Sequence, residues 1–162
     1  MISVAILTVS DSAVAGRRED LSGPALKQRS DELGWRVVAT AVVADEQESI
    51  SERLRSWADE GTARLVLTTG GTGISPRDVT PEATRAVLDR EIPGFAELMR
   101  IQGREQTKFS VLSRAVVGHR KQTLIVNLPG SPKGAVFSLR LIEALVPHVI
   151  DLLAGRTEHG AK

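Results

Sequence analysis

The chain has 162 residues, a length that suits one domain with its own hydrophobic core and is short for two. Its 21 Lys and Arg residues balance 20 Asp and Glu residues, and a net charge of +1 argues against the basic surface of a general nucleic-acid-binding protein. The sequence contains no cysteine, which excludes disulfides, zinc–thiolate sites and cysteine nucleophiles, so any metal would be held by oxygen or histidine.

The N-terminal segment lacks the basic region and small-residue cleavage site of a secretory signal peptide. No apolar run approaches the roughly 18 residues that a membrane-spanning helix requires. The sequence therefore predicts a cytoplasmic protein with no membrane segment.

Residues 2–43 are expected to form a strand, a helix and a second strand. Residues 2–9 are almost all apolar, which is typical of a strand covered on both faces. The helix is expected to begin at Ser22, a candidate N-terminal cap, and to end near Leu33, and residues 35–43 alternate as a second strand does.

Residues 45–69 repeat this order of helix and strand. Asp45 is followed three residues later by Glu48, the pattern of a capping box, so we expect a helix from here through Glu60. Residues 63–69 form an apolar run that predicts a third buried strand.

Two helices and two strands are expected next. Thr80 is placed to cap a helix whose first residue is Pro81, and Pro93 separates that helix from a second, amphipathic one. The apolar stretches at residues 109–117 and 123–128 predict two further strands.

Ser131 is placed to cap a final helical stretch that extends to about Leu153 and is interrupted at Pro147. Residues 155–162 are expected to form a disordered tail, which leaves residues 1–154 as a single domain. Strands that alternate with helices in this way predict an α/β fold of three layers, α/β/α, around a mostly parallel sheet.

The third expected strand runs directly into a loop rich in glycine and threonine. The loop begins with Thr69, Gly70, Gly71, Thr72 and Gly73. Glycines allow positive φ angles and close approach of a ligand, while N–H groups and hydroxyls supply the donors that phosphate or carboxylate oxygens need. The spacing matches neither a Walker A loop nor a dinucleotide-binding loop. The alternative is a turn that only reverses the chain.

Several polar groups follow the ends of expected parallel strands and should therefore meet at one edge of the sheet. They are Ser10 and Asp11, Asp45, the loop from Thr69 to Asp78, and Asn127, Pro129, Gly130 and Ser131. Carboxylates beside phosphate-binding loops indicate a hard cation such as Mg²⁺ between them. This combination suits phosphoryl or nucleotidyl transfer between two phosphorylated molecules. A simple turn at Asp11 and a helix cap at Asp45 are the structural alternatives.

Seven motifs together resemble the molybdopterin adenylyltransferase family of molybdenum cofactor biosynthesis. In chain order they are Val9-Ser10-Asp11, Asp45-Glu46-Gln47, residues 67–73, residues 77–83, Pro93-Gly94-Phe95, Leu112-Ser113-Arg114 and residues 127–132. The resemblance covers roughly residues 3–153.

The resemblance implies transfer of AMP from Mg²⁺-bound ATP to the terminal phosphate of molybdopterin, with Asp45 and Asp78 as the critical, metal-binding acidic residues. It also implies a pterin-side contact at Ser113, a homotrimer or a hexamer, and the molybdate-insertion enzyme as a candidate partner. A noncatalytic molybdopterin-binding paralogue and a molybdate-insertion module of the same pathway are the alternatives.

Overall fold

Successive side chains of the first strand enter two separate hydrophobic cores, one on each face of the sheet. In β1 (Ser3–Val9), Val4 and Ile6 belong to one core, and Ala5 and Leu7 belong to the other. All four side chains are buried, as the apolar run at residues 2–9 predicts for a strand covered on both faces. The structure is a computed structural model, and it describes residues 1–157.

Within these residues, six strands form one sheet with the order β2-β1-β3-β6-β5-β4. The strands after β1 are β2 (Arg36–Val43), β3 (Leu65–Thr69), β4 (Arg90–Glu91), β5 (Val117–Arg120) and β6 (Thr123–Leu128). Strands β2, β1, β3 and β6 are parallel to one another, while β5 pairs antiparallel with β6 and β4 pairs antiparallel with β5. The predicted α/β fold with a mostly parallel sheet is confirmed.

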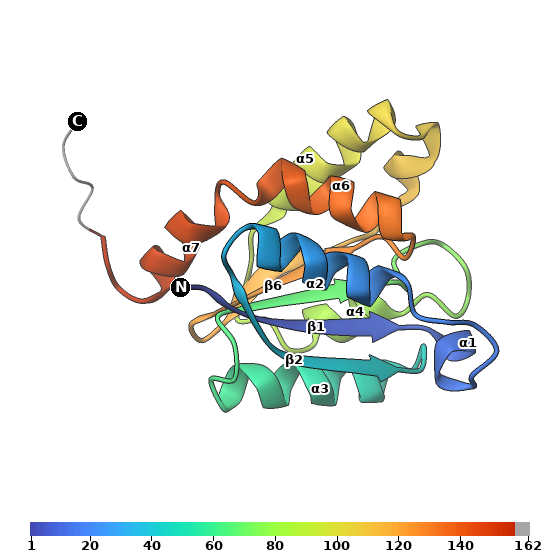
Figure 1. Cartoon of the computed structure of the whole chain (residues 1–162), viewed down its shortest axis with the longest axis horizontal. Coiled ribbons are helices and arrows are strands. Elements are labelled where there is room, and N and C mark those ends of the chain that lie inside the picture. The colour runs from blue at the N-terminus through green and yellow to red at the C-terminus, as the bar shows by residue number, and fades with distance from the viewer. Residues whose placement is uncertain (158–162) are drawn as a thin grey trace.

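Helices cover both faces of this sheet (Figure 1). One layer contains α2 (Ser22–Glu32), α5 (Pro93–Gln102), α6 (Pro132–Ile142) and α7 (Val146–Leu153), and the other contains α3 (Gln47–Asp59) and α4 (Thr80–Arg85). The short helix α1 (Asp11–Val14) lies at the end of β1, and two 3₁₀ turns, η1 (Gly103–Glu105) and η2 (Lys108–Leu112), follow α5. No helix in the described part of the chain is long and apolar enough to cross a membrane.

The strand predicted at residues 109–117 is wrong over most of its length. Residues 108–112 form the turn η2, because the Thr107 side chain accepts the backbone N–H of Phe109 and caps this turn. Phe109 and Val111 are 63% and 53% exposed, so their apolar character does not place them in the sheet. Only Val117 and the three residues after it pair as a strand.

Two predicted helix caps have different outcomes. Ser131 accepts the N–H of Gly134 at 3.1 Å and caps α6, as predicted. Ser22 instead lies inside α2, and the carboxylate of Asp20 accepts the N–H of Gly23 at 3.0 Å. Helix α7 ends at Leu153, and residues 158–162 of the predicted tail lie outside the described residues.

The hairpin of β5 and β6 is tied to α3 by an ion pair that should make stability depend on acid pH. Arg120 donates to both carboxylate oxygens of Asp59, at 2.9 and 2.8 Å, and to the carbonyl of Val87 at 3.1 Å. The hydrogen bonds from Arg120, followed by that from Lys121, lower the pKa of Asp59 from 3.8 to about 2.

Because the folded-state pKa is depressed, the stabilisation from this pair is complete above pH 3.8 and is lost as the pH falls through about 2. We expect an Asp59→Asn variant to lose less stability than the parent protein over this window, measured by urea unfolding at a series of pH values. Identical pH dependence in the two proteins would show that the ion pair contributes nothing in solution.

Candidate functional site

A cleft of about 530 Å³ opens at the carboxyl ends of β1 and β3. Of the residues predicted from sequence, it is lined by Ser10, Asp11, Asp45, Thr69, Gly70, Gly71, Asp78, Gly130 and Ser131. Segments that are far apart in the sequence thus meet at one edge of the sheet, as expected for loops that follow parallel strands. We call this the acidic cleft.

A second cavity, of about 510 Å³, lies on the other side of Ser131, which lines both. The remaining predicted residues line this cavity: Thr72, Gly73, Ser113, Asn127 and Pro129. Its walls also include Met99, Phe109, Leu112 and Phe137, so it is the more apolar of the two. The sequence predicts that these residues meet at one edge of the sheet and serve two phosphorylated ligands, and in the structure they line two adjoining cavities.

Asp11 and Asp45 hold each other through reciprocal hydrogen bonds. The N–H of Asp11 donates to Asp45 Oδ2 at 2.9 Å, and the N–H of Asp45 donates to Asp11 Oδ1 at 2.9 Å. The predicted capping box at Asp45 is therefore wrong, because helix α3 begins at Gln47 and the Asp45 carboxylate bonds to another segment. These bonds fix the chain that leaves β1 against the chain that leaves β2.

Arg77 completes this arrangement from the glycine-rich loop. Its Nε and Nη2 atoms each donate to the Asp11 carboxylate at 2.9 Å. The hydrogen bonds from Arg77, and then that from the Asp45 backbone, lower the pKa of Asp11. The Asp11 carboxylate is thus already bonded to protein donors. Its main role is to hold Asp45 in place.

Asp45 reaches into the acidic cleft next to Gly71. A Cβ atom at Gly71 would lie 3.0 Å from Asp45 Oδ1 and 2.4 Å from Thr80 Oγ1, and the φ angle there is +67°. Only glycine fits this position without displacing the site. Burial, with added repulsion from the charges of Asp11 and Asp78, raises the pKa of Asp45. A cation between Asp45 and Asp78 would relieve this repulsion.

Asp78 lies at the far end of the same loop, where the loop folds back on itself. Its Oδ2 atom accepts the N–H of Ser75 at 3.0 Å, and its own N–H donates to the Ser75 carbonyl at 2.9 Å. A Cβ atom at Gly73 would lie 2.8 Å from Asp78 Oδ2. The carboxylate therefore lies against the glycine-rich loop, and glycine at position 73 leaves room for it.

Thr80 holds this loop from inside rather than capping α4 as predicted. Its hydroxyl donates to the Gly70 carbonyl at 2.9 Å and its N–H donates to the Gly71 carbonyl at 3.1 Å. Val79 precedes α4 without a side-chain cap. The hydroxyl predicted to stabilise a helix therefore shapes the loop instead.

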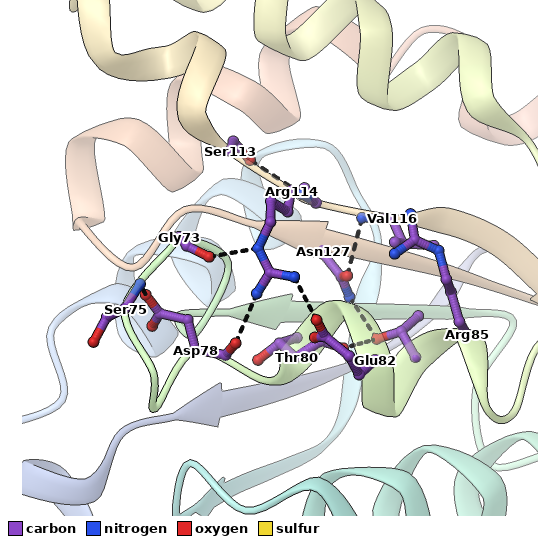
Figure 2. A network of polar contacts seen from close by, with 12 residues as sticks. Gly73, Ser75, Asp78, Thr80, Glu82, Arg85, Ser113, Arg114, Val116 and Asn127 are labelled. Carbon is purple, nitrogen blue, oxygen red and sulfur yellow. Dashed lines mark hydrogen bonds and ion pairs between the residues drawn. The ribbon is translucent and has the colours of Figure 1, made fainter.

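Arg114 was not among the residues predicted from sequence to form the site, yet its side chain bonds to both Gly73 and Asp78 of the loop (Figure 2). Its guanidinium donates to the carbonyls of Gly73 and Asp78, each at 2.7 Å, and pairs with the carboxylate of Glu82. Burial alone would raise the pKa of Glu82, but the bonds from Arg114 and from the backbone keep it below its usual value. The sequence signal that could have identified Arg114 is its place in the Leu112-Ser113-Arg114 motif.

Asn127 builds the frame of the site. Its side chain is fully buried, and its Nδ2 group donates to the hydroxyls of Thr68 and Thr84, each at 3.0 Å. Its Oδ1 atom accepts the N–H of Val116 at 3.1 Å. These bonds join β3, α4 and the approach to β5, and they leave neither amide hydrogen for a ligand. Asn127 was predicted to contact substrate, whereas its side-chain bonds give it a structural role.

The two glycine-containing loops pack against each other at the ends of β3 and β6. Thr69 donates through its hydroxyl to the carbonyl of Pro129 at 2.6 Å. A Cβ atom at Gly130 would lie 3.2 Å from the Cα atom of Gly70. The close approach of these backbones places Ser131, the cap of α6, at the boundary between the two cavities.

Positive charge is available at the edge of the acidic cleft. Arg17 and Arg18 line it, and within residues 1–157 neither forms an ion pair. Because Arg77 is committed to Asp11, these two arginines are free to meet an anionic ligand.

The donor set suits a cation that arrives with its own ligands. Among the described residues, no group of three or more His, Asp or Glu side chains could hold a metal ion. Mg²⁺, however, is commonly bound by one or two carboxylates together with substrate phosphates and water. Asp45 and Asp78, beside a loop with free backbone donors, fit that mode.

Comparison with known proteins gives a consistent result over nearly the whole chain. Residues 5–148 match the family model described as "probable molybdopterin binding domain". The chain is 40% identical over 156 residues to the molybdopterin adenylyltransferase of Helicobacter pylori, covering 95% of this chain and 89% of that protein. It is 41% identical to the molybdenum cofactor synthesis protein cinnamon of Drosophila melanogaster, with 94% of this chain but only 26% of that longer protein covered.

Solved structures agree with this result. The molybdopterin biosynthesis enzyme MoaB from Thermus thermophilus superimposes with a TM-score of 0.90 at 49% sequence identity. The comparison covers 96% of this chain and 98% of the other.

Proposed function

This chain belongs to the family of molybdopterin-binding domains, and we propose that it transfers AMP from ATP to the terminal phosphate of molybdopterin. The observation that carries this proposal is the acidic cleft, where Asp45 and Asp78 face a glycine-rich loop. The similarity to molybdopterin adenylyltransferases over almost the full length of the chain supports it.

In the proposed reaction, an oxygen of the terminal phosphate of molybdopterin bonds to the α-phosphorus of ATP. The bond from that phosphorus to the oxygen that bridges to the β-phosphate breaks, so adenylyl-molybdopterin forms and pyrophosphate leaves. Little covalent chemistry is required of the protein, because such transfers depend mainly on positioning and on charge stabilisation.

The acidic cleft would provide both the positioning and the charge stabilisation. The loop from Thr69 to Asp78 and the loop that ends at Ser131 would bind phosphate oxygens. Arg17 and Arg18 would meet the charge of the departing pyrophosphate. Asp45 and Asp78 would hold Mg²⁺, which when bound neutralises charge on the phosphates. Asp11 and Arg77 keep Asp45 in place for this role.

The second cavity would receive the pterin. Its apolar walls, which include Phe137 and Met99, suit a planar ring, and Ser113 offers a hydroxyl to the polar edge of that ring. Because Ser131 lines both cavities, the phosphate of a pterin bound here would point toward the acidic cleft.

The decisive experiment is incubation of the protein with molybdopterin and Mg-ATP, followed by assays for pyrophosphate and for adenylylated pterin. Formation of both products in equal amounts supports the proposal, and omission of Mg²⁺ should stop it. Binding of molybdopterin without pyrophosphate release would indicate a noncatalytic paralogue. Turnover only with adenylyl-molybdopterin and molybdate would indicate the molybdate-insertion step.

We also propose that the protein is a homotrimer, with a hexamer as the alternative. Exposed apolar side chains on α5 and η2 are consistent with an interface, since Ile101 is 65% and Val111 is 53% exposed. Light scattering at micromolar concentration should give three or six times the mass of one chain. A stable mass of a single chain would contradict this prediction.

A further inference from the structure

The carbonyl oxygens of the loop after β3 are held by two residues, Thr80 and Arg114. Thr80 binds the carbonyls of Gly70 and Gly71 through its hydroxyl and its N–H. Arg114 binds the next two, because its N–H donates to the Thr72 carbonyl at 2.8 Å and its Nε donates to the Gly73 carbonyl at 2.7 Å. Four consecutive carbonyls are therefore turned toward these two residues.

This arrangement determines where the amide groups of the loop point. In a planar trans peptide the C=O and the following N–H point in opposite directions, so the N–H groups of residues 71–74 point away from Thr80 and Arg114. In the described part of the chain, none of these four N–H groups has a hydrogen-bond acceptor. Gly71 lines the acidic cleft, and Thr72, Gly73 and Ile74 line the second cavity. Successive free amides of this kind form an anion-binding concavity.

The guanidinium of Arg114 also closes the loop at its other end. While Nε binds the Gly73 carbonyl, Nη2 binds the Asp78 carbonyl at 2.7 Å, so one planar group spans the two ends of the segment that carries Asp78 (Figure 2). Glu82 holds the third nitrogen and so fixes the orientation of the fork. Lysine has the charge but not this geometry.

We infer that Arg114 is a positioning residue, which keeps the amides of residues 71–74 turned toward phosphate bound where the two cavities adjoin and keeps Asp78 at the acidic cleft. The inference rests on the proposed function only for the identity of the natural phosphate ligand. Anion binding by the loop can be measured with a simple probe, Mg-pyrophosphate, so the two can be tested separately.

The test compares Arg114→Lys, Glu82→Gln and a control, Arg120→Lys. Arg120 is matched to Arg114 because it also binds a carboxylate and a backbone carbonyl, but it lies at the opposite end of β5. Titration of ¹⁵N-labelled protein with Mg-pyrophosphate follows the amide signals of residues 71–74, and the dispersion of the remaining signals reports the fold. Production of adenylylated pterin is measured in parallel.

In the parent protein and in Arg120→Lys we expect pyrophosphate to shift the signals of residues 71–74 with equal affinity. In Arg114→Lys the affinity should fall about 10- to 100-fold, by analogy with the loss of metal affinity when a residue that orients a metal ligand is removed. Glu82→Gln should show a smaller loss in the same amides.

Parent-like affinity in a folded Arg114→Lys would overturn the inference, as would a parent protein whose 71–74 amides do not respond to pyrophosphate. Should Arg114→Lys not fold, parent-like affinity in Glu82→Gln would overturn it. A parent protein that binds pyrophosphate at these amides but makes no adenylylated pterin would contradict the proposed function alone.

Discussion

An Asp78→Asn variant should fold normally and lose adenylyl transfer by a factor on the order of 10²–10³, the range seen when one electrostatic contact to a transition state is removed. Asn retains an oxygen that can accept the N–H of Ser75, so the shape of the loop is kept. What disappears is the negative charge in the acidic cleft, where Asp45 and Asp78 would share a cation.

The measurement is the initial rate of pyrophosphate release at several Mg²⁺ concentrations, together with thermal unfolding of each variant. Asp31→Asn is the matched control, since it removes one carboxylate charge from an exposed ion pair on α2. Asp45→Asn should also lose activity, because it too removes a negative charge from the acidic cleft. Its fold should be kept, because an Asn oxygen can still accept the N–H of Asp11. Full activity of Asp78→Asn would refute its role as a metal ligand.

The sequence predicted the fold well because the signals involved are local and strong. Apolar runs such as residues 2–9 and 63–69 are explained by burial on both faces of a parallel sheet, and β1 and β3 lie there. Once the strands are parallel, their carboxyl ends must meet, which is why Asp45 and Asp78 could be expected in one site.

The incorrect helix caps share one physical cause, which is that a polar side chain bonds to whatever partner the fold brings near it. Thr80 and Asp45 have the residue types and positions of helix caps, but neither caps a helix. Their nearest partners, Gly70 and Asp11, come from other segments, and no local pattern can reveal such contacts. The predicted strand over residues 109–117 is wrong for a different reason, because the apolar content of a segment does not tell whether its side chains are buried.

Within the candidate site, Arg114 shows most clearly what could not be predicted from sequence. From sequence, Arg114 falls within the strand expected at residues 109–117, and nothing nearby indicates that its partners are Gly73, Asp78 and Glu82. These residues lie between 32 and 41 positions away in the chain. The residues expected to touch ligand could thus be chosen from motif chemistry, whereas the residues that hold them in place required the structure.

The largest effect on stability is expected from Asn127→Ala. Asn127 is the only asparagine in the sequence, and its side chain is completely buried among three partners. Truncation leaves the N–H of Val116 without an acceptor and leaves a cavity beside the hydroxyls of Thr68 and Thr84. Since each unsatisfied buried group costs roughly 1–3 kcal/mol, the free energy of unfolding should fall by on the order of 3 kcal/mol.

For a chain of this size that loss corresponds to a decrease in Tm of about 6–12 °C. Chemical denaturation would measure this loss. Gln28→Ala is the control, because it removes an exposed amide that donates to Glu32 and should change stability by less than about 0.5 kcal/mol. A similar small change in Asn127→Ala would mean that water or a shift of β5 replaces the lost bonds. The expected large loss, with substrate affinity retained in the fraction that stays folded, would place Asn127 in the frame that holds the site and not among the groups that contact substrate.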